Sequence, residues 1–233
     1  MKMELAGRTI AITGAFGNLG AQIVLAAESA GARVAAIDVA PASAIARGAQ
    51  VHSYGGVDLG DPKSALDVFD RIARELGALD GLVNVAGGFR WERITDGSID
   101  AWDAMYRINV RTAVIACQAA LPHLLARGPG GRIVNVGALG AVKAAAGMGA
   151  YAASKAGVAR LTESLAEELK DRGITVNAIL PSIIDTPANR RDMPDADSGR
   201  WVQPREIADM ILFLLSPRAQ AVTGALLPVP GRV

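Results

Sequence analysis

The sequence predicts a single α/β domain, residues 1–233, in which helices cover both faces of a doubly wound parallel sheet. Two observations carry this prediction. Short runs rich in β-branched residues alternate with longer stretches in which apolar residues recur every three or four positions, as in strand–helix–strand units. The length suits one open α/β sheet, and no repeat, linker or low-complexity tract divides it.

The composition excludes several classes of protein. With 51% hydrophobic and 20% charged residues, the chain can build a core and is not predominantly disordered. The net charge of +1 offers no basic field, so we expect no nucleic-acid or membrane partner. Cys117 is the single cysteine, which rules out an internal disulfide. The sequence has no signal-peptide pattern and no apolar run of about 20 residues, and it therefore predicts a cytoplasmic protein.

Residues 8–13 (RTIAIT) are predicted to form the first strand, and residues 18–30 a helix that Gly31 ends. Residues 33–38 (RVAAID) form the second strand and residues 50–54 a weaker third.

The next helix is predicted to begin at Pro62. The Asp61 carboxylate can cap free N–H groups, and proline loses no hydrogen bond at the first helical position. Spacings of three and four place four apolar side chains on the buried face of this helix: Leu66, Phe69, Ile72 and Leu76.

The second half of the chain continues the alternation. Further strands are predicted at residues 81–84, 132–136, 175–180 and 225–229, and further helices at 101–127, 150–172 and 204–215. Residues 187–200 (PANRRDMPDADSGR) contain turn-forming residues and no apolar period. We expect an irregular surface loop there, at the carboxyl edge of the sheet, where ligands bind in such folds.

A glycine-rich turn follows the first strand. Gly14, Gly17 and Gly20 would let the backbone turn tightly, approach a pyrophosphate and pack the helix on the strand. The helix start would then offer free N–H groups to the phosphates. Glycines spaced in this way also occur for purely structural reasons, and the position between a strand and a helix favours the binding interpretation. The other candidate binding residues of the turn are Phe16, Asn18 and Leu19.

Asp38 ends the second strand and indicates which dinucleotide binds. A carboxylate there can bind both ribose hydroxyls of NAD and repels the 2′-phosphate of NADP. A solvated loop aspartate is the alternative. No basic residue follows directly, and Arg47 is the first. We therefore expect NAD(H) rather than NADP(H).

Two further segments fit a cofactor site, and either could be ordinary loop sequence. Asp58 and Leu59 follow the third strand, where a carboxylate could meet the adenine amino group. Asn84, Ala86 and Gly87 follow the fourth strand, where small residues would let the chain pass close to a ribose.

Tyr151 and Lys155 (YAASK) are four residues apart at a predicted helix start, so they share one face. The helix follows the fifth strand, which would direct this face toward the nicotinamide. A tyrosine has a pKa near 10. A neighbouring ammonium, together with the positive ring of the cofactor, would lower this pKa and allow proton exchange near neutral pH.

The segments TGAFGNLG, NVAGG, YAASK and TVNAILPSIIDTP, in this order, resemble the short-chain dehydrogenase/reductase family over residues 8–231. The resemblance implies a seven-stranded Rossmann sheet, a homodimer or homotetramer, and Tyr151 as proton donor or acceptor. It implies that Lys155 binds the nicotinamide ribose and that Asn109 holds a water of the proton relay. Thr186 would contact the nicotinamide amide, and the backbone from Pro181 to Ile184 would line the ring.

The sequence also departs from the family pattern. Ala138 occupies the position of the substrate-orienting serine, Gly17 lies one place early, and Ser182 replaces a usual glycine. These departures resemble the dihydropteridine reductase branch, as does the segment at 185–201. A quinonoid dihydropterin is electron-poor and would tolerate the loss of the serine hydroxyl.

Other residues are set aside. His52 and His123 lack a partner at ligand spacing, so we expect no metal site. Trp91 could line the substrate entrance, while Trp102 and Cys117 are expected to pack. The charges of residues 189–200 could belong to a solvated loop, form a substrate lid or pair with one another.

These observations predict an oxidoreductase that reduces a small pterin-like, imine or carbonyl substrate with NADH. The alternative enzyme is an alcohol or ketone dehydrogenase, for a 3-oxoacyl or hydroxy compound, with Ser182 or a water in place of the serine. A cofactor-binding protein without turnover is the other class, and the presence of Tyr151, Lys155 and Asn109 argues against it.

Overall fold

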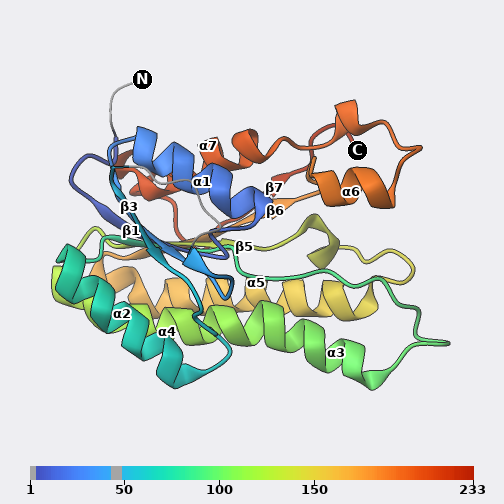
Figure 1. Cartoon of the computed structure of the whole chain (residues 1–233), viewed down its shortest axis with the longest axis horizontal. Helices are drawn as coiled ribbons and strands as arrows, with labels where there is room; N and C mark the ends of the chain where they lie inside the picture. The colour runs from blue at the N-terminus through green and yellow to red at the C-terminus, as the bar shows by residue number, and fades with distance from the viewer. Residues whose placement is uncertain (1–3, 43–48) are drawn as a thin grey trace.

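The computed structural model describes residues 4–42 and 49–233. Seven strands form one sheet in the order β3-β2-β1-β4-β5-β6-β7, and all six neighbouring pairs are parallel. The expected seven-stranded, Rossmann-like α/β fold is therefore confirmed (Figure 1). The strands are β1 (Thr9–Thr13), β2 (Arg33–Ile37), β3 (Val51–Tyr54), β4 (Gly81–Asn84), β5 (Arg132–Val136), β6 (Thr175–Pro181) and β7 (Leu226–Val229).

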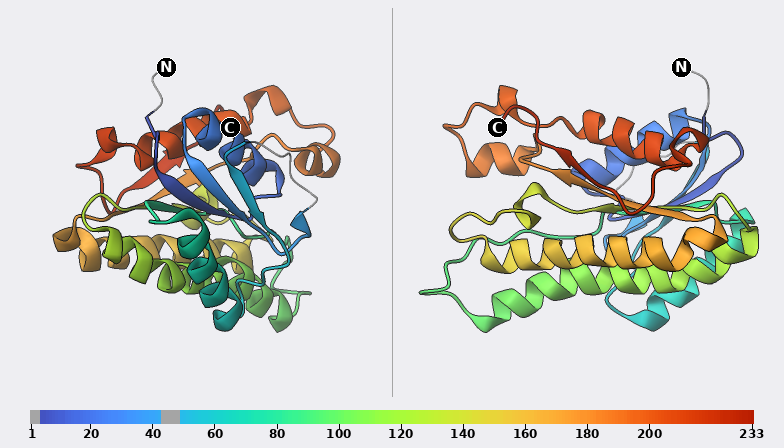
Figure 2. Two further views of the ribbon diagram at one scale, coloured as in Figure 1. Left: turned by 60° about the vertical axis from the view of Figure 1, so that its left-hand side comes forward. Right: turned by 180° about the vertical axis from the view of Figure 1, so that it is seen from behind.

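Helices form one layer on each face of the sheet, as the two views of Figure 2 show. Apolar side chains of α1 and α7 pack on one face, and those of α2, α4 and α5 on the other. Cys117 is buried in the second of these cores, as expected. The helices are α1 (Asn18–Ser29), α2 (Pro62–Leu76), α3 (Ile99–Met105), α4 (Thr112–Arg127), α5 (Gly149–Leu169), α6 (Pro187–Asp192) and α7 (Pro204–Leu215).

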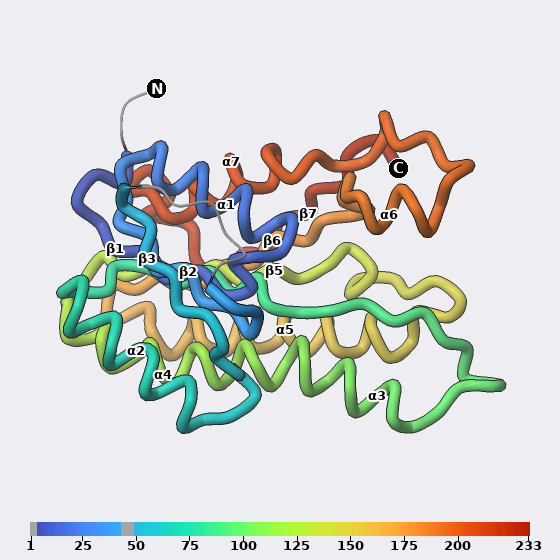
Figure 3. Tube along the Cα trace, in the orientation of Figure 1, coloured from blue at the N-terminus to red at the C-terminus, as the bar shows by residue number. Residues whose placement is uncertain are grey.

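The strand order positions a binding crevice. The chain moves outward from β1 to β3 in one direction and from β4 to β7 in the other, so the order reverses between β1 and β4. Ligands bind beyond the carboxyl ends of the strands at such a reversal. In Figure 3 the segments that follow β4 and β5 and the segment that contains α6 extend from the same end of the sheet.

The buried face of α2 differs from the expectation at one position. Phe69, Ile72 and Leu76 are buried as predicted, but Leu66 is 49% exposed. The stripe that contacts the sheet instead includes Ala65 and Val68. A small alanine fits where the helix lies close to the sheet. The prediction considered only large apolar residues and therefore missed Ala65.

The region expected as one helix at 101–127 is a continuous but uneven helix. It begins as α3 at Ile99, widens into a π-helical turn over Tyr106–Arg111, and continues as α4. The sequence pattern did not predict this turn, because a single extra residue barely changes the apolar spacing. Such turns often occur at functional sites.

The segment at 187–200 is more ordered than the expected irregular loop. It begins with α6, whose first residue is Pro187, and the Thr186 hydroxyl caps the helix by accepting from the Asn189 N–H at 3.2 Å. No side chain of α6 is buried, which explains the missing apolar period.

Phe69→Ala is expected to lower the free energy of unfolding by about 3–5 kcal/mol, because the ring is fully enclosed in the core. Leu66→Ala, a matched control on the same helix, removes a half-exposed side chain and should cost less than about 1 kcal/mol. Urea titrations followed by circular dichroism would measure both. Equal losses would contradict the buried face assigned to α2.

Candidate active site

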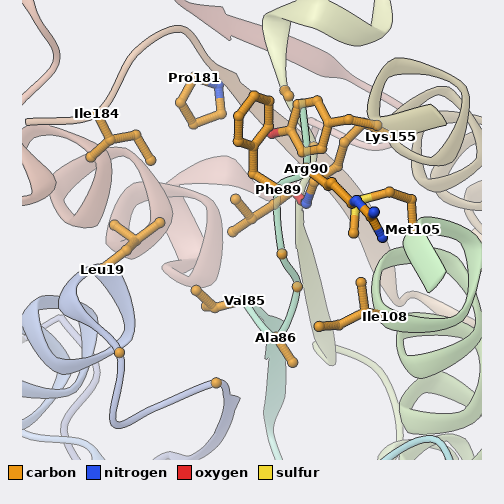
Figure 4. Close-up of a pocket in the computed structure, with 18 of the residues that line it drawn as sticks. Leu19, Val85, Ala86, Phe89, Arg90, Met105, Ile108, Lys155, Pro181 and Ile184 are labelled. Carbon is orange, nitrogen blue, oxygen red and sulfur yellow. The ribbon is translucent and has the colours of Figure 1, made fainter. Parts of the chain in front are cut away.

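A cleft of about 2010 Å³ lies at the carboxyl edge of the sheet. Figure 4 shows side chains from several segments around it, among them Leu19, Phe89, Lys155 and Ile184. Most of the residues proposed from the sequence line this cleft: Gly14, Phe16, Gly17, Asn18, Leu19, Gly20, Asp38, Asp58, Leu59, Ala86, Gly87, Tyr151, Lys155, Pro181, Ile184 and Thr186. Asn84 and Asn109 do not line it.

The glycines of the first turn are needed for two different reasons. Gly14 has φ +61, and a side chain there would lie 2.7 Å from the Ala86 nitrogen. A side chain at Gly20 would clash with the Gly14 carbonyl. At Gly17, which caps α1, an added carbon would meet only one protein atom, at 3.5 Å. Gly14 and Gly20 therefore allow close packing, whereas Gly17 keeps the cleft open at the start of a helix, which suits an anion.

Asp38 is tied to this turn. Its carboxylate accepts a hydrogen bond from the Phe16 N–H at 2.9 Å and another from the Ala40 N–H at 3.0 Å. These bonds fix a partly exposed carboxylate beside the glycine turn, where it can accept further bonds from a ligand. Arg47, the first basic residue after Asp38, lies outside the described residues.

The next two candidate segments have different outcomes. Asp58 is exposed at the cleft, where its carboxylate accepts from the Gly60 N–H at 2.7 Å. Asn84 is 5% exposed and donates to the Asn135 side chain at 2.9 Å and to the Cys117 sulfur at 3.3 Å. It joins two neighbouring strands inside the sheet, so its side chain lies away from the cleft in which a cofactor ribose was expected to meet this segment.

Asn109 lies in the π-helical turn and joins three segments. Its amide nitrogen donates to the Gly88 carbonyl at 3.1 Å and to the Ser154 hydroxyl at 3.0 Å, while its oxygen accepts from the Gly88 N–H at 3.0 Å. A side chain at Gly87 would lie 2.6 Å from this oxygen. Asn109 therefore positions the loop after β4 and the start of α5, and Ser154 is a partner that the sequence analysis missed.

Lys155 is buried, and its ammonium donates to the Val136 carbonyl at 2.8 Å. Burial lowers the pKa of this amine to about 8. Burial also raises the pKa of Tyr151 to about 12, whereas a neighbouring ammonium was expected to lower it. The Tyr151 ring is held edge-on to Phe89, with ring centroids 4.9 Å apart. At neutral pH the cleft therefore contains a protonated phenol and a buried cation.

The position of the missing serine is apolar. Ala138 lines the cleft and is 5% exposed. Ser182 also lines the cleft, but its hydroxyl donates to the Pro230 carbonyl at 2.7 Å. Neither position presents a free hydroxyl proton to a ligand beside Tyr151.

The two histidines lie away from the cleft. His52 is exposed on β3. His123 lies 3.0 Å from an Asp70 oxygen, a partner from another helix that sequence spacing could not indicate. Within residues 4–42 and 49–233, no three His, Cys, Asp or Glu side chains converge as a metal site would require, and no helix is both long and apolar enough to span a bilayer.

Comparisons with known proteins show which family this chain resembles over nearly its whole length. A family model described as enoyl-(acyl carrier protein) reductase matches residues 14–231. D-threitol dehydrogenase of Mycolicibacterium smegmatis is 35% identical, and the match covers 98% of this chain and 93% of that protein. The 2-(S)-hydroxypropyl-CoM dehydrogenase 3 of Xanthobacter autotrophicus is 33% identical, with 99% and 98% covered. The crystal structure of a dehydrogenase/reductase from Sinorhizobium meliloti 1021 superposes with a TM-score of 0.88 at 30% identity, with 99% and 96% covered.

Lys155→Met is expected to raise the free energy of unfolding at pH 7 by about 1–3 kcal/mol. On folding, the pKa of the Lys155 amine falls from 10.5 to about 8, so folding disfavours the charged form. Each pKa unit corresponds to about 1.4 kcal/mol. The substitution also removes the hydrogen bond to the Val136 carbonyl, and this loss offsets part of the gain in stability. The cost is fully present below about pH 8 and disappears as the pH rises toward 10.5.

Urea titrations near pH 7 and near pH 10.5 would measure this effect. Lys170→Met, which removes an exposed lysine at the end of the same helix, is the control and should give no gain. A gain for Lys155→Met that does not change with pH would contradict the assignment of a buried charge.

Proposed function

Because the chain belongs to the short-chain dehydrogenase/reductase family and is an NAD(P)-dependent oxidoreductase, we propose that it transfers a hydride between NAD(H) and a small carbonyl, imine or pterin-like compound. The observation that carries this proposal is that Tyr151 and the buried Lys155 line the same cleft as the glycine turn and Asp38. A proton donor and a dinucleotide cradle thus meet at one opening.

The residues of the cleft fit a dinucleotide. The N–H groups at the start of α1 would hold the pyrophosphate across Gly17, where the protein leaves space. The Asp38 carboxylate would accept bonds from the ribose hydroxyls, and Asp58 would meet the adenine amino group. Thr186, whose hydroxyl caps α6, would contact the nicotinamide amide. When bound, the reduced cofactor supplies the hydride.

Tyr151 would move the proton. In the reducing direction its hydroxyl donates to the substrate oxygen or nitrogen, and the raised pKa keeps this proton in place at neutral pH. Lys155 would bind the nicotinamide ribose and stabilise the tyrosinate that forms. Asn109 supports this pair through Ser154, and the water expected beside it would return the proton.

Ala138 is the feature that bears on the substrate. With no hydroxyl there, the cleft does not polarise a carbonyl from that side, which favours compounds that are already electron-poor. A quinonoid dihydropterin is such a compound, and Ala138 therefore supports a place in the dihydropteridine reductase branch. The relatives described above are named for alcohol substrates instead, and they support an alcohol or ketone dehydrogenase as the second candidate.

We also propose a cytoplasmic homodimer or homotetramer. What supports association is the apolar surface of the long helical segment, where Ile99, Trp102 and Tyr106 are 73%, 37% and 60% exposed. A contiguous exposed apolar patch typically marks an interaction site.

NADH is expected to bind at least tenfold more tightly than NADPH, which is about 1.4 kcal/mol, because a phosphate on the ribose would face the Asp38 carboxylate. Asp38→Ser should reduce the ratio below about threefold. Calorimetric titration would measure all affinities, with Asp103→Asn on the exposed side of α3 as a control. Equal or tighter NADPH binding by the unchanged protein would overturn the preference.

Turnover tests the function itself. NADH oxidation is measured with quinonoid dihydropterin, flavins, quinones and small ketones, and the largest kcat/KM decides between the two candidate substrates. Tyr151→Phe should lower kcat by about 10²-fold or more on ketones while NADH affinity stays within about twofold, because only the proton is lost. Tyr106→Phe, an exposed tyrosine outside the cleft, should have no effect. NADH binding without turnover of any compound would favour a non-catalytic binding protein.

A further inference from the structure

The side of the cleft away from the glycine turn is strongly apolar. Its lining includes Phe89, Trp91, Leu139, Val142, Met148 and Met193. Three of these remain widely open to water, with exposed fractions of 58% for Phe89, 53% for Trp91 and 71% for Val142. Covering this apolar surface with an apolar ligand would remove it from water and so favour binding.

Three polar side chains of this region already donate hydrogen bonds within the protein. Ser182 donates to the Pro230 carbonyl at 2.7 Å, and Asn189 donates to the Ile184 carbonyl at 2.7 Å. The Trp91 indole N–H donates to the Ala146 carbonyl at 3.0 Å. A ligand with several hydroxyl groups would lose water here and gain few partners in return.

The charged side chains near the opening add few hydrogen bonds for a ligand with several hydroxyl groups. Arg90 is paired with Glu92 at 2.6 Å. Lys143 and Asp192 are exposed, so a bond from either of them to a ligand replaces a bond to water.

Trp91 is held in place as an aromatic wall. Besides its indole bond to Ala146, the next residue, Glu92, donates its N–H to the Gly147 carbonyl at 2.8 Å. Gly147 has φ +76, and any side chain there would clash with the indole. Arg93 lies over the ring, 5.6 Å from its centroid. The loops after β4 and β5 are thereby joined through a tryptophan that needs glycine opposite it.

We propose that the substrate is a flat, electron-poor ring ketone with few or no hydroxyl groups, and that Trp91 is the residue that selects it. The aromatic side chains favour a flat partner. Ala138 favours a carbonyl that is already activated, and the committed donors of Trp91, Ser182 and Asn189 disfavour polyols. This inference rests on the proposed function and narrows its substrate class.

The reaction balances as a two-electron reduction. The carbonyl carbon gains the hydride that NADH supplies, and the carbonyl oxygen gains the proton of the Tyr151 hydroxyl. The C=O double bond becomes a C–O single bond, an alcohol leaves together with NAD⁺, and water returns one proton to Tyr151. The substrate ring contributes its reactive carbonyl and is otherwise unchanged.

The test compares two activated ketones of different shape. Isatin is a flat ring ketone, and D-erythrulose is an open-chain ketone with three hydroxyl groups. With NADH and the unchanged protein, kcat/KM is expected to be about 100-fold or more higher for isatin, since each hydroxyl without a partner weakens binding by about tenfold. Calorimetric titration of the NAD⁺-bound protein with each compound gives a second readout that needs no turnover.

Variants of Trp91 test its part in selection. Trp91→Ala should raise KM for isatin about tenfold or more with kcat changed less than about threefold, because the wall binds the ring and does not move the proton. Trp91→Phe keeps an aromatic face and should restore KM to within about threefold. Ile94→Ala, which removes an exposed apolar side chain outside the cleft, should leave both constants unchanged.

Each outcome separates the inference from the proposed function. Preference for D-erythrulose would overturn the inference and leave the oxidoreductase standing. Tight isatin binding that is lost in Trp91→Ala, without turnover of isatin or of any compound of the panel, would support the selected class and overturn the catalytic proposal. Absence of both binding and turnover of isatin would overturn the inference alone, and the proposed function would still stand if NADH reduced another compound of the panel.

Discussion

The side-chain amide of Asn109 is the interaction on which the rest of the site depends. It accepts a hydrogen bond from the Gly88 N–H and donates to the Gly88 carbonyl. It also donates to the hydroxyl of Ser154, one residue before Lys155. The π-helical turn directs it inward, where it is 1% exposed. The bond to Ser154 is buried, so leaving it unmade would cost about 1–3 kcal/mol. The loop after β4 and the start of α5 therefore hold their positions relative to one another before any ligand arrives.

This anchoring explains how a costly charge can be kept in the cleft. The Lys155 amine lies in a dry environment with the Val136 carbonyl as its partner, and its pKa falls because burial disfavours the cation. A more flexible helix start would let the ammonium move to water. Functional sites commonly retain such unfavourable groups at the expense of stability, with rigid packing around them. The apolar position at Ala138 makes the same region drier still.

Sequence patterns predicted most of the fold, because glycine turns, apolar runs and helix caps are local signals. The glycine turn, Asp38 and the Tyr151–Lys155 pair reach one cleft because parallel strands bring their carboxyl ends to one edge. Three features depend on tertiary contacts and could not be predicted in this way. Asn84 is turned toward a neighbouring strand, Ser154 meets Asn109 across two helices, and burial reverses the expected pKa shift of Tyr151.

In the charged segment after β6, as in the apolar wall of the cleft, polar side chains bond to other groups of the protein. Arg190 binds Asp185 through two bonds of 2.6 and 2.8 Å, and Gln203 adds a third at 2.9 Å, which together hold the pKa of Asp185 at about 2. These bonds fix α6 against the start of α7. Met193, the residue that follows α6, lines the cleft. The Arg190–Asp185 pair thus holds the segment in position, and the segment brings Met193 to the cleft together with the polar side chains of Thr186, Asn189 and Asp192.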